Sequence, residues 1–325
     1  MKKNQSKYKL IVDHVINGIN NGAMKKGDWI PSINEFREKY NFSRDTVFAG
    51  LSELKAKGII DSKPGIGYFI MSTKTEFKHK IFLLFNEINI FKEDLYNSFV
   101  ENIGLKNSVD LYFHNYNRNV FETLIKEANH KYTTYIIMSG KFMGIEPLLS
   151  SLSGKVFLLD HFHSELKGKY SSVSQNFEKD TYDALVSGLV FLKKYNHLFL
   201  VQKEEIEPKE RFNGLAEFCK KYNFNYNYIA TVENRSITKG EVYLVVNDRD
   251  LVYLLKQADA QNMKPGKDFG IISYNDTVLK EVLASGITTL STDFKQMGKT
   301  MALLINKNGI ETIDNPWKLN VRNSL

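Results

Sequence analysis

Seven short apolar runs between residues 80 and 273 are the feature that most limits what this chain can fold into. They are KIFLLF (80–85), VDLYF (109–113), YIIM (135–138), VFLL (156–159), HLFLV (197–201), VYLVV (242–246) and FGIIS (269–273). Apolar strands that alternate with longer amphipathic helices are typical of a parallel sheet covered on both faces. The number of runs favours two similar α/β lobes over a single sheet.

The first 71 residues follow a different pattern. An apolar stripe at helical spacing ends near residue 20, and a second helix is expected after Pro31, where Ser32 and Glu35 have the spacing of a capping box. A third helix is expected to begin after Ser43 and to end at Gly58. Residues 59–63 and 68–71 can then pair as a hairpin. Three short helices and a hairpin predict a winged helix-turn-helix, an α+β domain.

The excess positive charge lies in this small segment. Residues 1–78 hold 14 Lys or Arg against 8 Asp or Glu, whereas residues 79–325 hold 30 against 29. A basic segment beside a neutral remainder indicates that the segment meets a polyanion. Membrane lipid is the competing polyanion, but the segment lacks a strongly amphipathic basic helix with Trp or Phe anchors. Double-stranded DNA is therefore the expected partner.

The third helix would present Ser43, Arg44, Asp45 and Thr46 at its exposed N-terminal end, which suits insertion into a major groove. A helix and hairpin that merely cap another domain would have the same shape. The segment from Gly27 to Ile70 resembles the DNA-binding domain of GntR-type bacterial repressors, as do the runs P-S at 31–32, S-R-x-T-V at 43–47 and G-x-G-x-F at 65–69. The resemblance implies that Arg44 contacts bases or phosphate.

The same resemblance implies phosphate contacts for Ser43 and Thr46 and a minor-groove position for the wing tip. Three family arginines are missing, since Asn34, Phe48 and Ile66 stand in their places. Their contacts are expected to weaken, or to pass to Lys55, Lys57 and Lys63. The predicted DNA-binding residues are Ser32, Asn34, Ser43, Arg44, Thr46, Phe48, Lys63, Gly65, Ile66 and Gly67.

Polar residues follow most of the apolar runs of the larger segment. Ligands of open α/β sheets bind outside the carboxyl ends of the strands, so these positions are candidate site residues. They are Asn86, His114, Asn115, Asp160, His161, Asn247, Asp248, Tyr274, Asn275 and Asp276. Carboxylates, amides and an aromatic ring are suited to bind sugar hydroxyls and a sugar face. Taken singly, each residue could equally be a turn or helix-cap residue.

Residues 245–300 carry VVNDRD, PGKDFGIISYNDT and ITTLSTDFKQMGKT, and the chain ends in LNVRNSL. In this order the segments resemble the effector domain of the lactose and galactose repressor family, whose fold is that of periplasmic sugar-binding proteins. The resemblance implies ligand contacts by Arg211, Asn247, Asn275 (where an aspartate is usual), Asp160 and Phe91, the last in the loop after the first strand. We expect a neutral sugar.

A GntR-type head on such a body resembles the arabinose repressor group. That pairing implies a homodimer and a pentose or a 6-deoxyhexose such as L-fucose or arabinose as inducer. The sequence thus predicts a winged-helix domain at 1–71, a linker at 72–79 and a two-lobed sugar-binding and dimerisation domain at 80–325. The function expected is that of a sugar-responsive transcription repressor.

Other functions have weaker support. Asp160, His161 and His163 could begin a metal site, but no further ligand has a recognisable spacing. No G-x-S-x-G elbow occurs, and Cys219 lies in an apolar helical pattern, so no catalytic residue, metal or cofactor is predicted. A sugar receptor, or a sugar-acting enzyme without a DNA role, is the alternative. The absence of a signal segment and of a long apolar run predicts a cytoplasmic protein without membrane contact.

Overall fold

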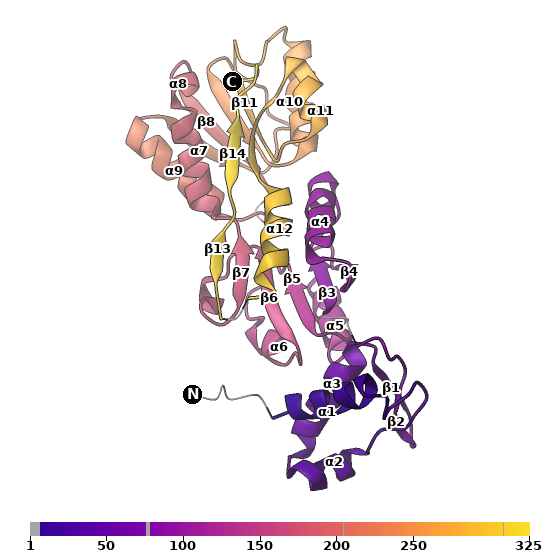
Figure 1. The fold of residues 1–325 in the computed structure, drawn as a ribbon. Coiled ribbons are helices and arrows are strands. Elements are labelled where there is room, and N and C mark those ends of the chain that lie inside the picture. The colour runs from indigo at the N-terminus through magenta and orange to yellow at the C-terminus, as the bar shows by residue number, and fades with distance from the viewer. Residues whose placement is uncertain (1–6, 76–78, 204, 308) are drawn as a thin grey trace.

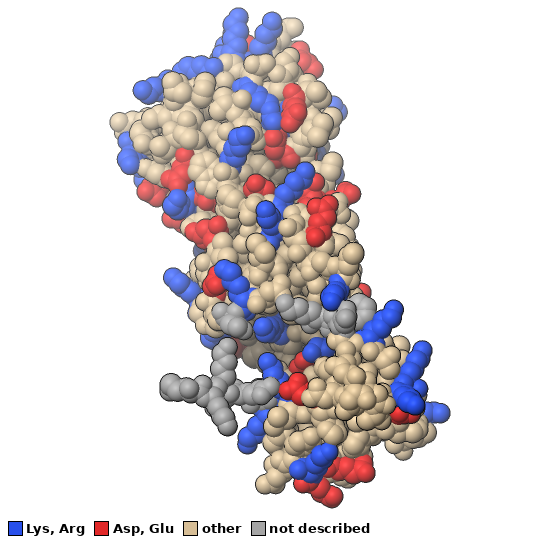
Figure 2. All heavy atoms as spheres, in the orientation of Figure 1, with Lys and Arg blue, Asp and Glu red and all other residues tan. Residues whose placement is uncertain are grey.

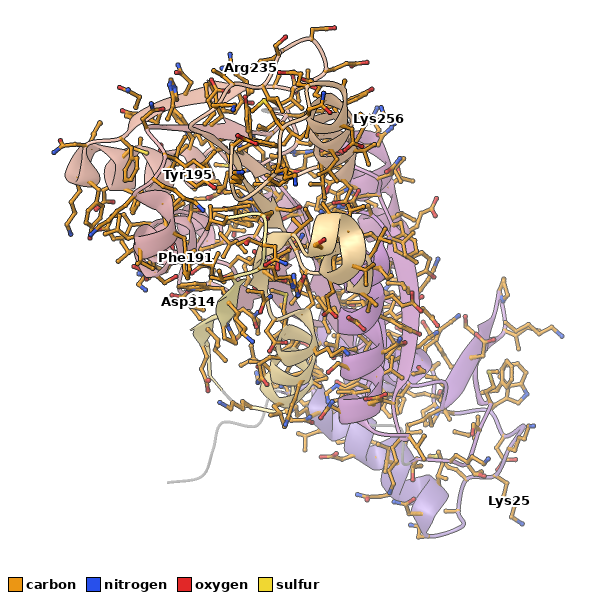
Figure 3. The ribbon with its side chains drawn as sticks, turned by 90° about the horizontal axis from the view of Figure 1, so that it is seen from above. Lys25, Phe191, Tyr195, Arg235, Lys256 and Asp314 are labelled. Carbon is orange, nitrogen blue, oxygen red and sulfur yellow. The ribbon has the colours of Figure 1, made fainter. Side chains whose placement is uncertain are left out.

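The fold divides into a small N-terminal head and a two-lobed body, which follow one another along an elongated molecule (Figure 1). The computed structural model describes residues 7–75, 79–203, 205–307 and 309–325. The predicted linker at 72–79 includes residues 76–78, which lie outside the described residues. In a view from above, Lys25 of the head lies at the opposite end of the molecule from Arg235 of the distal lobe (Figure 3).

The head is a winged helix-turn-helix, as predicted. It contains α1 (Lys9–Asn20), α2 (Ile33–Tyr40), α3 (Arg44–Ala56), β1 (Ile60–Lys63) and β2 (Gly67–Ile70). The two strands pair antiparallel, and Trp29 bridges to Phe69 beside them. Apolar side chains at helical spacing, among them Ile11, Phe36 and Leu51, are completely buried where the three helices meet. Helical periodicity therefore accounts for most of the head's core, to which Ile60 of β1 and Ile70 of β2 also contribute.

The proximal lobe contains a six-stranded sheet in the order β13-β7-β6-β5-β3-β4, with all strands parallel. Its elements are β3 (Lys80–Phe85), α4 (Ile90–Ile103), β4 (Ser108–Phe113), α5 (Arg118–Ala128), β5 (Thr134–Ile137), α6 (Glu146–Ser150), β6 (Lys155–Asp160), η1 (Ser164–Leu166), β7 (Ser171–Ser174), α12 (Phe294–Leu304) and β13 (Thr312–Asp314). Alternate residues of β3 face two separate buried cores. The sheet is therefore covered on both faces, as the apolar runs predict.

The distal lobe contains a second six-stranded sheet in the order β14-β12-β11-β10-β8-β9, parallel except at β14. Its elements are α7 (Phe177–Ser187), α8 (Leu189–Leu192), β8 (His197–Val201), α9 (Glu210–Tyr222), β9 (Asn225–Ile229), β10 (Glu241–Val245), α10 (Asp248–Ala260), β11 (Gly270–Tyr274), α11 (Val278–Val282), η2 (Leu283–Ser285), β12 (Thr288–Thr292) and β14 (Trp317–Asn320). Two buried cores again lie on the two faces of the sheet.

The chain crosses between the lobes three times, from β7 to α7, from β12 to α12 and from β13 to β14. After the second crossing, α12 packs closely on α4. A side chain added at Gly298 would place its Cβ 2.4 Å from the carbonyl oxygen of Leu95, so only glycine permits this approach. The crossings form the hinge about which two such lobes can move.

In the described part of the body, five strands have no counterpart among the seven apolar runs, namely β7, β9, β12, β13 and β14. Their sequences are rich in Ser, Thr and Asn; β7, for example, is Ser171–Ser174 and is entirely buried. The sequence predicts that Phe91 lies in the loop after the first strand. The structure instead places it in the first turn of α4. Within the described part of the chain, no helix is long and apolar enough to cross a membrane.

Candidate DNA-binding surface and ligand cleft

The first turn of α3 exposes the residues that the sequence predicts to meet DNA. The Ser43 hydroxyl accepts a hydrogen bond from the Thr46 amide at 3.3 Å and lies 2.8 Å from the Thr46 hydroxyl. This cap fixes the helix start. Arg44 is exposed and forms no ion pair with any described residue. An unpaired guanidinium beside the free amides of a helix N-terminus is suited to bind phosphate or a base edge.

The N-terminus of α2 has the predicted capping box. The Ser32 hydroxyl accepts from the Glu35 amide, and the Glu35 carboxylate accepts from the Ser32 amide at 2.7 Å. These hydrogen bonds lower the pKa of Glu35. Asn34 is exposed in the same turn. Ser32 therefore organises the helix that presents Asn34 to solvent.

The wing tip is exposed. Of the three lysines that could replace the missing arginines, only Lys63 forms no ion pair with a described residue. Lys55 lies 2.9 Å from the Asp61 carboxylate, and Lys57 lies 2.5 Å from the Glu53 carboxylate. Lys63 is exposed and has no ion pair among the described residues, and Ile66 is 60% exposed between Gly65 and Gly67. Both glycines have positive φ, as the tight tip requires. Of the lysines that could replace the missing arginines, Lys63 is the best placed.

Phe48 differs from the other predicted DNA contacts because it touches the body. Its ring lies 5.2 Å from the ring of His130 in an edge-on arrangement, and the side chain is 39% exposed. The exposed face of α3 is thus shared between solvent and the proximal lobe.

A cleft lies between the lobes at the carboxyl ends of the strands. Among its lining residues are five that the sequence predicts as ligand contacts, namely Phe91, Asp160, His161, Arg211 and Asn275. The cavity has a volume of ≈ 110 Å³. Both lobes contribute to it, since Phe91, Asp160 and His161 belong to the proximal lobe and Arg211 and Asn275 to the distal one. Lobe movement would therefore change the geometry of the cleft.

On the proximal side the centre of the cleft is Asp160, the last residue of β6. Its carboxylate accepts hydrogen bonds from Lys92 and Gln175, each at 2.6 Å. Burial alone would raise the pKa of Asp160, but the charge of Lys92 and these hydrogen bonds lower it. Asp160 is therefore an ionised acceptor with lone pairs that remain available to a ligand.

On the distal side the corresponding centre is Arg211, in the first turn of α9. Its guanidinium lies 4.6 Å from the ring centres of both Phe177 and Tyr274, and it donates to Glu207 at 2.5 Å. The buried Nε has no partner among the described residues. Burial lowers the pKa of Arg211, but interactions that include the charge of Glu207 raise it by more, so the pKa lies above its ordinary value. A buried, oriented and incompletely bonded guanidinium is suited to donate to a ligand oxygen.

His161 contributes a neutral ring. Burial and the nearby His163 lower the pKa of His161 to about 4. A neutral imidazole has one donor and one acceptor, which matches a hydroxyl group. His163 is itself buried and shares a hydrogen bond with the Ser139 hydroxyl at 2.6 Å.

The other predicted ligand residues have partners elsewhere and are not among the lining residues. His114 donates to the Met138 carbonyl at 2.9 Å, Asn247 caps α10, and Asp248 pairs with Lys280 at 2.8 Å. Asp276 pairs with Arg322 through both carboxylate oxygens, each at 2.7 Å. The Tyr274 ring lies against the guanidinium of Arg211, and its hydroxyl shares a hydrogen bond with the Thr181 hydroxyl.

Several lining residues were not predicted. They are Glu87, Lys92, Tyr116, Gly140, Lys141, Gln175, Phe177, Ile206, Glu207, Pro208, Val246 and Phe294, together with Asn86, which the sequence marks only as a strand-end residue. Gln175 directly follows β7, and Phe294 begins α12 shortly after β12; the apolar runs reveal neither strand. No three His, Cys, Asp or Glu side chains in the described ranges are grouped so that they could hold a metal ion.

Comparison with known proteins agrees with the division into a winged-helix head and a two-lobed body. Residues 7–70 match the family model described as bacterial regulatory proteins, gntR family. The head is a GntR-type domain. The chain is also 33% identical over 69 residues to a probable fructoselysine utilization operon transcriptional repressor of Escherichia coli K12, and equally to one of Shigella flexneri. That match spans 21% of this chain and 28% of each relative's length, so it concerns only a small part of either protein.

Solved structures show the fold of the body. A LacI family transcriptional regulator from Silicibacter pomeroyi superposes with a TM-score of 0.64 at 15% identity, and covers 75% of this chain and 98% of its own. A LacI family regulator from Enterococcus faecium with bound ribose gives a TM-score of 0.62 at 18% identity, with the same coverage. A GntR-type head is thus joined to a body with the LacI-regulator fold.

Proposed function

We propose that this chain is a sequence-specific transcription regulator that represses sugar-utilisation genes and is released from DNA by a neutral monosaccharide. The observation that carries the proposal is the pairing of a GntR-type head with an interlobe cleft that Asp160 and Arg211 line from opposite lobes. Neither a receptor nor an enzyme would need a basic winged helix.

The balance of charge in the cleft supports a neutral ligand. Three basic side chains, Lys92, Lys141 and Arg211, and three acidic ones, Glu87, Asp160 and Glu207, line it. Lys92 is paired with Asp160 and Arg211 with Glu207. A charged ligand would disturb a buried pair, whereas hydroxyl groups can use the remaining N–H groups and lone pairs of both pairs.

The size and lining of the cleft support a small ring. A volume of ≈ 110 Å³ is well below the roughly 300–1,000 Å³ of pockets for drug-sized ligands. Phe91 and Phe294 stack with ring centres 4.9 Å apart at its edge and offer an apolar face. A pentose or a 6-deoxyhexose such as L-fucose or arabinose fits this description. Ribose, bound by the Enterococcus faecium regulator, is of the same class.

The proposed mechanism is closure of the lobes about the three crossings. A sugar held by Asp160 and Arg211 at once favours the closed state, and in a homodimer closure would alter the spacing of the two heads relative to two DNA half-sites. The differential affinity needed is modest, about 1–3 kcal/mol for a change of about 5- to 150-fold.

The experiment has two arms. An operator is selected from random duplex DNA with the full-length protein, and its affinity is measured between 50 and 200 mM salt; a steep fall in affinity is expected if phosphates are contacted. A panel of pentoses, hexoses and deoxyhexoses is then screened by thermal shift, since a ligand at 100 times its Kd adds about 2.7 kcal/mol. Failure to select any DNA sequence would refute the proposal that the protein is a DNA-binding regulator. Selection without a sugar response would refute only the proposal that a sugar is the inducer.

A further inference from the structure

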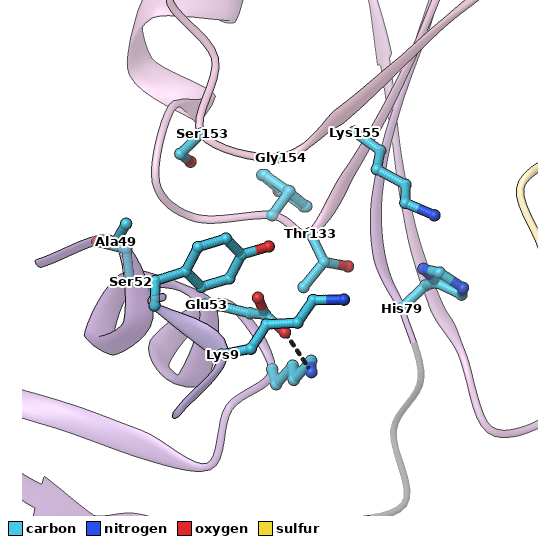
Figure 4. Close-up of a pocket in the computed structure, with 12 residues that line it drawn as sticks. Lys9, Ala49, Ser52, Glu53, His79, Thr133, Ser153, Gly154 and Lys155 are labelled. Carbon is cyan, nitrogen blue, oxygen red and sulfur yellow. Dashed lines mark hydrogen bonds and ion pairs between the residues drawn. The ribbon is translucent and has the colours of Figure 1, made fainter. Parts of the chain in front are cut away.

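A second cavity lies where the head meets the proximal lobe, well separated from the interlobe cleft. Figure 4 shows this junction cavity, which has a volume of ≈ 320 Å³. The head contributes Lys9, Ser52 and Glu53 to it, and the body contributes Thr133, Ser153 and Lys155. It is walled by α1 and α3 on one side and by the start of β6 with its preceding loop on the other.

The walls of the junction cavity carry positive charge on both sides. Lys9 belongs to the head and Lys155 to the body, and neither forms an ion pair with a described residue. Glu53 is the one carboxylate among the described lining residues, and Lys57 lies 2.5 Å from it. Like charges on opposing walls repel, and an anion placed between them would offset that repulsion. The cavity is therefore electrostatically suited to an anion.

One hydroxyl donor is available in the same space. Ser52 is 8% exposed, and its hydroxyl has no hydrogen-bond partner in the part of the chain that the structure describes. The Ser153 hydroxyl oxygen accepts from the His130 amide at 3.2 Å, and its O–H interacts with the Tyr135 hydroxyl, so Ser153 already has partners. The Ser52 hydroxyl opens onto the cavity, so it can donate to an acceptor that lies there.

Close packing holds both walls in place. A Cβ at Gly154 would lie 2.6 Å from the Thr133 carbonyl oxygen, and a Cβ at Gly50 would lie 2.8 Å from Cβ of Ile11. The loop that carries Ser153 is thus held against β5, and α3 is held against α1. Each wall is therefore rigid by itself, so few side chains need to be ordered when a ligand binds.

We propose that the junction cavity binds the phosphoryl group of a small phosphorylated metabolite, held by Lys9 and Lys155 with Ser52 as a further donor. Phosphoryl oxygens are strong acceptors that lysines and hydroxyls bind well. Because the ligand touches both halves of the molecule, its occupancy fixes the head on the body. The site is a second effector site, independent of the sugar that the interlobe cleft takes.

The test uses full-length protein at constant ionic strength, with pyrophosphate and inorganic phosphate titrated by calorimetry. Saturable binding is expected for the natural chain, at least tenfold weaker binding for Lys155→Gln, and weaker binding for Ser52→Ala. Lys131→Gln is the matched control, since it removes the same charge from an exposed position of the same lobe that does not line the cavity. Equal weakening in Lys155→Gln and Lys131→Gln, or no saturable binding at 10 mM, would overturn the proposal.

Backbone phosphate of DNA is the other source of the same chemistry. If a free metabolite is the ligand, Lys155→Gln binds the selected operator as tightly as the natural chain does in phosphate-free buffer. A loss of operator affinity in Lys155→Gln, together with no binding of free pyrophosphate, would assign the cavity to DNA and overturn the metabolite proposal.

Discussion

The ammonium group of Lys92 lies 2.6 Å from the carboxylate of Asp160, with the two side chains only 3% and 13% exposed. The pair joins α4 to the end of β6 on the proximal wall of the cleft. A buried pair of this kind is costly to break, because the remaining charge is left without a partner.

Lys92→Met is therefore expected to destabilise the protein by about 3–5 kcal/mol in urea unfolding. The matched control is Lys126→Met, which removes an equivalent charge that is 65% exposed and 3.3 Å from Glu122; it should cost less than about 1 kcal/mol. Equal effects of the two substitutions would show that the Lys92 pair is no more important than a surface pair.

The same pair predicts a dependence on pH. Since the folded-state pKa of Asp160 lies below its unfolded value of about 3.9, the folded protein binds fewer protons at this group. Its contribution to stability is present above the unfolded pKa and is lost as the pH falls through the folded pKa. The acid unfolding midpoint of Lys92→Met should consequently lie at a higher pH than that of the natural chain.

Asp180 lies near the first crossing between the lobes, and we expect it to have the opposite effect on how stability depends on pH. Burial raises the pKa of Asp180 to about 7, so the folded protein binds more protons than the unfolded one between about pH 4 and that value. Its ionisation therefore lowers stability as the pH rises. Asp180→Asn, which keeps an acceptor for the Asn176 amide, should stabilise the protein at pH 8 by about 1–3 kcal/mol. The gain should vanish at pH 4, and Asp183→Asn should show no such change.

Arg44 provides a direct test of the DNA-binding surface. Arg44→Ala should weaken operator binding and reduce the salt slope by about one unit, because one phosphate contact is lost. Arg37→Ala removes an equally exposed arginine from the last turn of α2 and serves as the control. An unchanged slope in Arg44→Ala would exclude a phosphate contact, and both variants should retain sugar binding.

A substitution at Asp276 tests whether this residue stabilises the fold or contacts the ligand. Its two hydrogen bonds with Arg322, each at 2.7 Å, fasten the C-terminal segment to the loop after β11. Asp276→Ala should cost about 1–3 kcal/mol of stability, measured by urea unfolding. Sugar affinity should stay within a factor of about two, because Asp276 is not among the residues that line the cleft. A tenfold loss of affinity would instead make it a ligand contact.

Strand-end reasoning identified part of the cleft because parallel strands all end at one edge of their sheet. It predicted Asp160 and His161 after β6 and Asn275 after β11. It missed Gln175 because β7 is built from Ser and Val, whose pattern is not apolar. Lys92 could not be predicted either, since a lysine in a helix is ordinarily a solvated surface charge.

The positions of the strand-end residues outside the cleft have physical reasons too. Asn247 follows β10 but begins α10, where its side chain accepts from the Arg249 amide at 2.7 Å. A residue between a strand and a helix can serve as either a cap or a ligand contact, and the sequence does not distinguish the two. Similarly, the contact of Phe48 with His130 depends on how the head docks, which no local pattern specifies.

Arg211 is central to the account, and Arg235 is its natural control. Each arginine pairs with a glutamate and lies over an aromatic ring, but Arg235 packs on Phe199 in the distal lobe (Figure 3) and does not line the cleft. Figure 2 shows acidic and basic side chains interspersed over the body, so the loss of one arginine should leave its overall field little changed.

The most direct measurement is the affinity of the full-length protein for its selected operator, with and without the sugar that stabilises it, in Arg211→Ala and Arg235→Ala. We expect Arg211→Ala to bind the operator normally and to be no longer released by sugar, while Arg235→Ala is released like the natural chain. Normal release of Arg211→Ala by sugar would contradict this expectation.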